Sequence, residues 1–214
     1  MNTFVGFCGY SLAGKSEAAK YLERAYGYKR MSFGAHATEE TLNMLKEYAV
    51  RVLKKKPDSD SIKQLLARYR QEMNDPEMKE KWRKTIVEVG FIQRMMDPLY
   101  FCRKINDEMI EDIHDNPPIT KFTIDNIRFQ EEADFFYKTH TSFIIRINNN
   151  RLDLSDPKYE ESTENPDGIK HDYVINNDSS LGKLYAGIDH AMSEFATVVS
   201  DAVYNEIKGC KNVN

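Results

Sequence analysis

The segment Gly9–Ser16, with the sequence GYSLAGKS, constrains the fold of this chain more than any other feature. It fills every fixed position of the pattern G-x-x-x-x-G-K-[ST], the sequence of a phosphate-binding P-loop. The preceding residues 3–8 form a short apolar run, which predicts a strand buried on both faces. The following residues 17–24 are good helix formers, with Ala19 and Leu22 spaced for an inner face. The sequence therefore predicts a strand, a glycine loop and a helix in the order that this motif requires.

The residue types in this loop suit a polyphosphate. Gly9 and Gly14 allow backbone conformations that a side chain would forbid, so successive N–H groups can surround an anion at the positive end of the helix dipole. We expect Lys15 to face solvent and to supply charge for the β- and γ-phosphates, and Ser16 to ligate Mg²⁺. A turn that only reverses the chain would explain the glycines but neither Lys15 nor Ser16. The residues predicted to bind a nucleoside triphosphate are Gly9, Tyr10, Ser11, Leu12, Ala13, Gly14, Lys15 and Ser16.

Composition is typical of a soluble globular protein. The chain has 214 residues, of which 41% are hydrophobic, and a net charge of −4 at pH 7, so no bulk attraction to nucleic acid is expected. The three cysteines, Cys8, Cys102 and Cys210, match neither a metal-site spacing nor a disulfide framework. No apolar stretch has the length of a membrane span, and the first residues do not resemble a signal peptide. We therefore expect a cytoplasmic protein without a nucleic-acid or membrane partner.

Predicted strands and helices alternate along the chain, which favours an α/β fold with a parallel sheet flanked by helices. Further strands are expected at residues 28–33, 121–124, 141–147 and 172–175, and further helices at 129–138 and from 181 onward. We expect one P-loop domain, whose core is built from about residues 1–35, 116–147 and 172–210.

Two segments are expected to be inserted into this core. Residues 36–115 are dense in Glu, Lys, Arg, Leu and Met and contain one glycine, which predicts a helical substrate-binding insertion. Its helices should break near 57–60, 74–76 and 97–98. Residues 148–171 are polar and carry two prolines; we expect a polar lid with little to hold it against the core.

These insertions favour a small phosphotransferase over other P-loop proteins. Such enzymes close mobile segments over the site, because water would otherwise hydrolyse the triphosphate. The chain also lacks the N-K-x-D type of base-reading motif that a GTPase carries.

Several charged residues lie near predicted element ends, where they would serve a phosphate acceptor. Such an acceptor is already anionic near neutral pH, so its site needs positive charge rather than a strong base. The arginines in such positions are Arg94, Arg128, Arg146 and Arg151, for each of which a solvated surface position is the alternative. Asp125 ends a predicted strand and is expected to hold Mg²⁺ together with Ser16; an ordinary turn aspartate is the alternative.

Beyond the P-loop, two segments carry a recognisable pattern. Residues 87–98, VEVGFIQRMMDP, contain a glycine, then an arginine, then Asp-Pro before a predicted helix, and residues 124–133 read IDNIRFQEEA. Together with the P-loop they resemble the deoxynucleoside monophosphate kinases of bacteriophages, relatives of adenylate kinase and dephospho-CoA kinase. The third segment is similar to the family's D-V-R-F-x-N-E. Aligned on V-R-F, it places Asn126 at the acidic position, and a shift of one residue places Asp125 there, so both remain open. Residues 172–181, DYVINNDSSL, are similar to the family's last strand and helix start.

The resemblance implies a P-loop kinase fold and an ATP- and Mg²⁺-dependent transfer to a deoxynucleoside monophosphate, giving dNDP and ADP. By the resemblance, Arg94 and Arg128 would bind the acceptor phosphate, with Asp125 beside them, and Arg146 and Arg151 would contact the donor phosphates. The catalytic residues would then be Lys15, Arg128, Arg146 and Arg151.

Alternatives remain open for the function. The chain is either such a kinase, a kinase of another small phosphorylated metabolite such as dephospho-CoA, or a nucleotide-gated binding protein without transfer. Its partners would be small nucleotides, in the host cytoplasm if a phage encodes it. The bases accepted, the preference for ribose or deoxyribose and the oligomeric state, a homodimer included, are also open.

Overall fold

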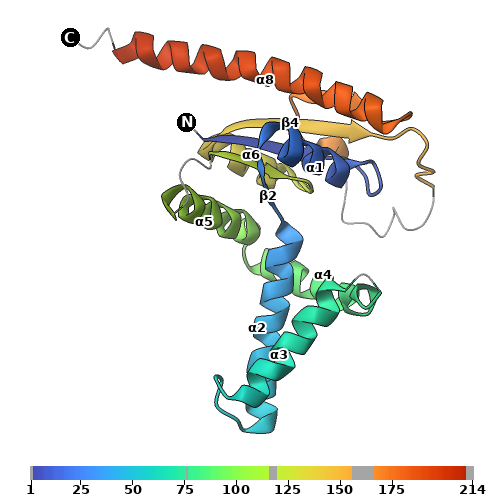
Figure 1. The fold of residues 1–214 in the computed structure, drawn as a ribbon, viewed down its shortest axis with the longest axis vertical. Helices are drawn as coiled ribbons and strands as arrows, with labels where there is room; N and C mark the ends of the chain where they lie inside the picture. The colour runs from blue at the N-terminus through green and yellow to red at the C-terminus, as the bar shows by residue number, and fades with distance from the viewer. Residues whose placement is uncertain (1, 76, 116–119, 156–165, 211–214) are drawn as a thin grey trace. The chain divides into compact units, whose positions relative to one another are not determined.

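The fold is described for residues 2–75, 77–115, 120–155 and 166–210 of a computed structural model, with side chains left out at residues 79 and 201–210 (Figure 1). The chain divides into two compact units. We call Met1–Met31 with Glu108–Asn214 the sheet unit, and Ser32–Asp107 the helical unit. Each is described by itself.

A parallel sheet forms the centre of the sheet unit. In the described part of the chain its strands are β1 (Thr3–Cys8), β2 (Lys29–Met31), β3 (Lys121–Ile124), β4 (Thr141–Asn148) and β5 (Tyr173–Asn176). Their order is β2-β3-β1-β4-β5, and every neighbouring pair is parallel. The apolar strand β1 is central and buried from Phe4 to Cys8, as its sequence predicts for a strand covered on both faces.

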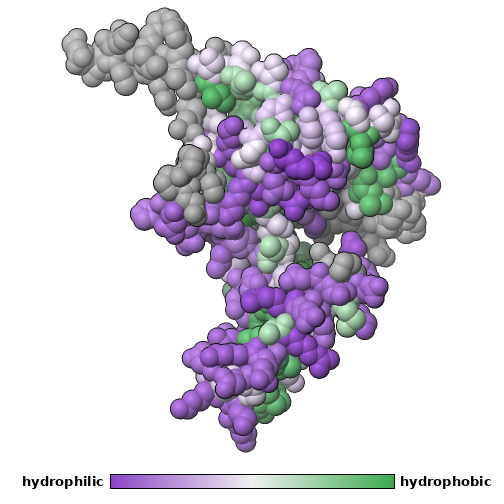
Figure 2. Space-filling view, in the orientation of Figure 1, coloured by the Kyte–Doolittle hydropathy of each residue, from purple (hydrophilic) through white to green (hydrophobic). Residues whose placement is uncertain are grey.

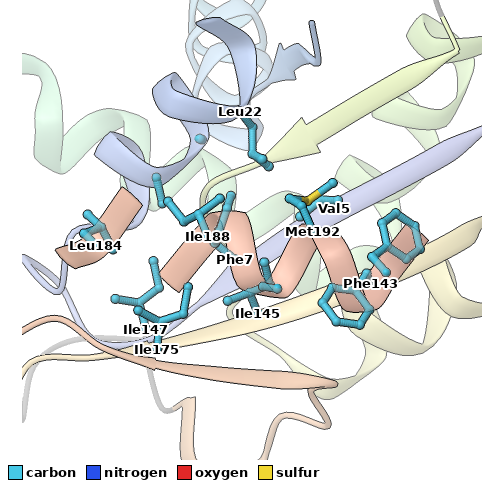
Figure 3. Packing of buried hydrophobic residues seen from close by; sticks show 14 of the residues in the cluster. Val5, Phe7, Leu22, Phe143, Ile145, Ile147, Ile175, Leu184, Ile188 and Met192 are labelled. Carbon is cyan, nitrogen blue, oxygen red and sulfur yellow. The ribbon is translucent and has the colours of Figure 1, made fainter. Parts of the chain in front are cut away.

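Helices cover both faces of this sheet. The helices α1 (Lys15–Tyr26) and α8 (Leu181–Cys210) pack on one face, where α8 extends along the sheet (Figure 1). Figure 3 shows this core, which includes Val5, Phe7, Leu22, Phe143, Ile145, Ile147, Ile175, Leu184, Ile188 and Met192. The alternate residues of the strands point to the other face, where Phe4 stacks on Phe136 of α6 (Gln130–Thr139) with ring centroids 4.0 Å apart. The predicted α/β fold with a parallel sheet flanked by helices is confirmed.

The helical unit consists of α2 (Phe33–Leu53), α3 (Asp60–Asn74), α4 (Lys79–Met96) and the first half of α5 (Tyr100–Asp115). The helices end near the breaks that the sequence predicts. Its interior includes Leu42, Ile62 and Met73. Apolar side chains also reach its surface between hydrophilic ones (Figure 2). Tyr48 and Val52 on α2 are exposed.

The predicted lid, residues 148–171, is only partly covered by the described residues, since 156–165 lie outside them. The expectation that little holds this segment against the core does not apply to its end. Pro166, in the short turn η1 (Pro166–Gly168), and Ile169 are both buried. The backbone N–H of Lys170 donates to the Gln130 side chain of α6 at 2.7 Å. The end of the segment is therefore anchored to the sheet unit by apolar burial and a hydrogen bond.

None of the described helices is both long and apolar enough to cross a membrane.

Candidate nucleotide-binding site

The P-loop connects β1 to α1 and takes the backbone conformations that its glycines permit. Gly9 and Gly14 have φ angles of 137° and 108°. A Cβ on Gly9 would lie 2.3 Å from the backbone oxygen of Ile147, and a Cβ on Gly14 would lie 2.4 Å from the Asn177 side-chain nitrogen. Gly9 is therefore required both by its conformation and by its close approach to a backbone atom, whereas Gly14 is required by its conformation.

Asn177, which follows β5, holds the loop from the side. Its Nδ2 donates to the Ala13 oxygen at 2.8 Å, and its backbone N–H donates to the Asn148 oxygen at the end of β4 at 2.7 Å. Asn177 is not among the predicted site residues. A polar residue at the end of a predicted strand was the available signal, but its partner is 164 residues away in the chain.

Lys15 lies against the loop rather than in solvent. Its Nζ donates to the backbone oxygens of Gly9 at 2.6 Å and Tyr10 at 2.8 Å, and the residue is 8% exposed. The prediction that Lys15 faces solvent is wrong, because the carbonyl groups of the turn offer partners that compensate for the burial of the ammonium. A positive charge is thus fixed beside the loop, at the N-terminus of α1.

Ser16 and Asp125 follow the carboxyl ends of two neighbouring strands, β1 and β3. Ser16 lies in the first turn of α1, which follows β1, and Asp125 directly follows β3, which pairs with β1. This edge is where parallel α/β sheets bind ligands. Within the described ranges, no group of three or more His, Cys, Asp or Glu side chains is placed for a metal. Mg²⁺ usually takes one or two protein oxygens together with phosphates, so a hydroxyl and a carboxylate are donors of the right chemistry.

Arg128 is oriented by two residues close to it in the chain. Its Nε donates to Asn126 Oδ1 at 2.9 Å, and its backbone N–H donates to Glu132 Oε2 at 2.8 Å. Glu132 lies in the first turn of α6 and is 1% exposed. Glu132 is not among the predicted site residues, although a glutamate in the first turn of a predicted helix is a common capping signal. Asn126 is engaged with Arg128, and Asp125 supplies the carboxylate at this strand end.

Arg146, near the end of β4, is held by three acceptors. Its Nε donates to Asn148 Oδ1 at 2.8 Å, its Nη1 to the Pro166 oxygen at 3.1 Å and its Nη2 to Asp167 Oδ1 at 2.5 Å. Asp167 Oδ2 also accepts from the Tyr10 hydroxyl at 2.9 Å. The bonds from Arg146 and Tyr10 hold the pKa of the Asp167 carboxyl below its usual value. Asp167 is not among the predicted site residues, because an Asp-Gly pair in a polar segment is typical of any surface turn.

Arg146 also lies beside the beginning of the P-loop. It pairs across the sheet with Cys8, the last residue of β1. Burial raises the pKa of the Cys8 thiol to about 11, and the positive charges of Arg146 and Lys15 oppose that rise. Two of the predicted cationic residues, Arg146 and Lys15, are therefore close enough to the end of β1 to act on one group there.

The other two predicted arginines have different surroundings. Arg94, in α4 of the helical unit, places its guanidinium carbon 5.0 Å from the Phe101 ring centroid and 5.8 Å from that of Phe33. These are cation–π distances. Arg151 has an exposed side chain in the turn after β4, and its backbone N–H donates to Asn149 Oδ1. Their predicted contacts with phosphates remain predictions.

Comparison with known proteins shows similarity at the level of solved structures. No protein-family model matches the chain, and no curated protein does. The structure titled "Crystal structure of TT1252 from Thermus thermophilus" is 15% identical, with a TM-score of 0.47 over 90% of this chain and 97% of that one. A dephospho-CoA kinase from Campylobacter jejuni is 16% identical, with a TM-score of 0.45 over 92% of this chain and 98% of that one. At these values function has to be inferred from the residues of the site itself.

Proposed function

We propose that the chain is a kinase that transfers the γ-phosphoryl group of ATP to a deoxynucleoside monophosphate, giving dNDP and ADP. The observation that best supports the proposal is the P-loop at the carboxyl edge of the parallel sheet, with the Lys15 ammonium fixed by the oxygens of Gly9 and Tyr10. The loop N–H groups and the α1 N-terminus suit an anion. A glycine turn without a phosphate-binding role would not need a buried lysine.

Each residue of the site has a task in such a transfer. The loop backbone and Lys15 would bind the donor phosphates and offset the charge that develops on the transferring group. Ser16 and Asp125 would hold Mg²⁺, which would supply positive charge for the donor phosphates. The acceptor phosphate oxygen is already anionic, so no side chain has to remove a proton from it. Arg128 would hold that phosphate through its planar fork.

The choice of acceptor rests on the segments that resemble phage deoxynucleoside monophosphate kinases. These segments, residues 87–98 and 124–133, contain Arg94 and Arg128. Their guanidinium groups suit the paired oxygens of a phosphate better than an ammonium would. Arg128 is also held by Asn126 and by buried Glu132, as a substrate-orienting residue should be.

A coupled ADP-release assay over a panel of acceptors tests the proposal. The panel contains the deoxynucleoside monophosphates, the ribonucleoside monophosphates and dephospho-CoA. We expect turnover with at least one deoxynucleoside monophosphate. Turnover with dephospho-CoA alone would replace the proposed acceptor, and ATP binding without any transfer would indicate a nucleotide-gated binding protein.

Substitution of Lys15 tests the mechanism. Lys15→Met fills much of the same volume and should lower kcat by about 100-fold or more, because it removes a charge that acts on the transferring group. Lys20→Met is the matched control, since Lys20 lies on the same helix with its side chain 53% exposed. A folded Lys15→Met protein with near-normal turnover would rule out the P-loop mechanism.

A further inference from the structure

Hydrogen bonds form a closed ring beside the P-loop, and its members are far apart in the chain. Around the ring they are Tyr10, Ala13, Asn177, Asn148, Arg146 and Asp167. One half consists of the contacts of Asn177 described above. The ring closes within the loop itself, where the Ala13 N–H donates to the Tyr10 oxygen at 3.2 Å. The loop residues Tyr10 and Ala13 are thus linked to each other through the ends of β4 and β5 and through the turn η1.

Asp167 is the member of the ring whose carboxylate accepts hydrogen bonds from two side chains, those of Arg146 and Tyr10. One carboxylate oxygen accepts from Arg146 and the other accepts from Tyr10. Its side chain is 60% exposed, whereas that of Arg146 is 16% exposed. An exposed aspartate contributes little to folding stability through such a pair. Its geometry, with one oxygen for each partner, therefore calls for another explanation.

The three bonds of Arg146 fix its guanidinium in one orientation. Among the described residues they engage Nε, one N–H of Nη1 and one N–H of Nη2. A guanidinium carries further N–H groups on its two terminal nitrogens, which would be available to the oxygens of a phosphate. An arginine that is already fixed loses less side-chain entropy when it binds.

Tyr10 is fixed at the other oxygen. It is the first variable residue of the P-loop, and its backbone oxygen accepts from both Lys15 and Ala13. Its side chain reaches out of the loop to Asp167. Asp167 thus acts on the residue whose carbonyl helps to fix the Lys15 ammonium.

We propose that Asp167 is a positioning residue of the donor site, which holds Arg146 and Tyr10 in the arrangement that binds the triphosphate of ATP. The inference rests on the proposed function and extends it, because it adds a residue outside the P-loop to donor binding. Asp167 acts through Arg146 and Tyr10 and makes no contact with the nucleotide itself. Loss of its carboxylate should weaken the donor and leave the acceptor unaffected.

Calorimetric binding of the ATP analogue adenylyl imidodiphosphate, with Mg²⁺ present, gives the first test. We expect Asp167→Ala to raise the Kd about tenfold, since a charge-assisted contact no longer holds Arg146. Asp167→Asn keeps an oxygen for one partner and should have a smaller effect. Asp178→Ala is the control, because Asp178 is an exposed aspartate just after β5. This variant should bind the analogue as the wild type does.

A double-mutant cycle separates positioning from a general structural effect. If Asp167 acts through Arg146, then Asp167→Ala should add little to the loss caused by Arg146→Ala. Tyr10→Phe should reproduce only part of the Asp167→Ala effect. Additive losses in the cycle, unchanged binding by Asp167→Ala, or tighter binding by it would each overturn the inference.

The thermal midpoint and the acceptor KM complete the test. We expect Asp167→Ala to leave both nearly unchanged, because Asp167 is exposed and lies on the donor side. A large fall in the thermal midpoint with equal losses for donor and acceptor would show a structural role instead. A different result would contradict the proposed function itself: a wild-type chain that binds no analogue or transfers no phosphoryl group. Equal binding by wild type and Asp167→Ala contradicts only the inference.

Discussion

Single residues of the P-loop show what a motif predicts and what it leaves out. The pattern correctly indicated that positions 9 and 14 need glycine, because both have positive φ angles. It did not indicate which atoms enforce the choice. At Gly9 the neighbour is a backbone oxygen of β4, which cannot move without disturbing the sheet.

Replacement of this glycine should be costly for stability. Gly9→Ala forces a side chain into a φ of 137° and against the Ile147 oxygen, so we expect a loss of more than about 2 kcal/mol. Gly27→Ala is the matched control, because Gly27 also has a positive φ, of 69°, but no atom within 4 Å of its added Cβ; it should lose about 1 kcal/mol. Urea unfolding of the two variants measures the difference. Equal losses would mean that the close approach to β4 contributes nothing.

Arg128 allows a test of the acceptor side. Arg128→Lys keeps the charge but loses the planar fork, so the acceptor KM should rise about 10- to 100-fold, as expected for a charge-assisted hydrogen bond. The KM for ATP should change much less, because the P-loop holds the donor. Arg24→Lys is the control, because the Arg24 side chain on α1 is 61% exposed and has no proposed role, so the acceptor KM should stay unchanged. A larger change in the ATP KM than in the acceptor KM would place Arg128 on the donor side.

At the scale of helices and strands, the sequence predicted most of the elements. β1, β3 and β4 were predicted from apolar runs to within about a residue, and α1 and α6 from composition and spacing. These signals are local. The residues that hold the site are paired over long separations in the sequence, as Tyr10 is with Asp167. No local sequence pattern around either residue predicts which partner it will contact. Burial was also mispredicted at Lys15, where satisfied hydrogen bonds outweigh the usual preference of lysine for solvent.

The start of α6 gives a prediction at this scale. Glu132 is buried and joins the first turn of the helix to the loop that follows β3, through the Arg128 N–H. Glu132→Ala leaves that partly buried donor without its charged acceptor and should cost about 1–3 kcal/mol. Glu131→Ala, at the exposed neighbouring position, should change stability by less than about 0.5 kcal/mol. Denaturant unfolding measures both. Similar values for the two variants would show that the Glu132 contact does not stabilise the helix start.

At the scale of the whole molecule, the division into two units has a measurable consequence. The P-loop and the ring beside it lie in the sheet unit, whereas the single tryptophan, Trp82, lies in the helical unit. Trp82 packs edge-on to Tyr69 with ring centroids 5.3 Å apart, and its Nε1 donates to Glu72. Tryptophan fluorescence therefore reports on the helical unit, and circular dichroism reports on both units.

Nucleotide should stabilise the unit that binds it. At about 100 times its Kd, a ligand adds about 2.7 kcal/mol to the unit to which it binds. With adenylyl imidodiphosphate we expect the part of the dichroism transition that belongs to the sheet unit to move to higher temperature, and the Trp82 fluorescence transition to move less. Identical shifts of the two signals would show that the two units unfold as one.

The central place of β1 in the sheet also affects how the chain is made. β1 is synthesised well before its two neighbours, which are β3, beginning at residue 121, and β4, beginning at residue 141. On the ribosome, this apolar strand of six residues therefore stays unpaired while more than a hundred further residues are synthesised. Such long-range pairing is slow and leaves the strand exposed to aggregation. Newly made chains should depend on chaperones until residue 148 has emerged, and the nucleotide-binding loop can take its final form only after Asn177 has emerged.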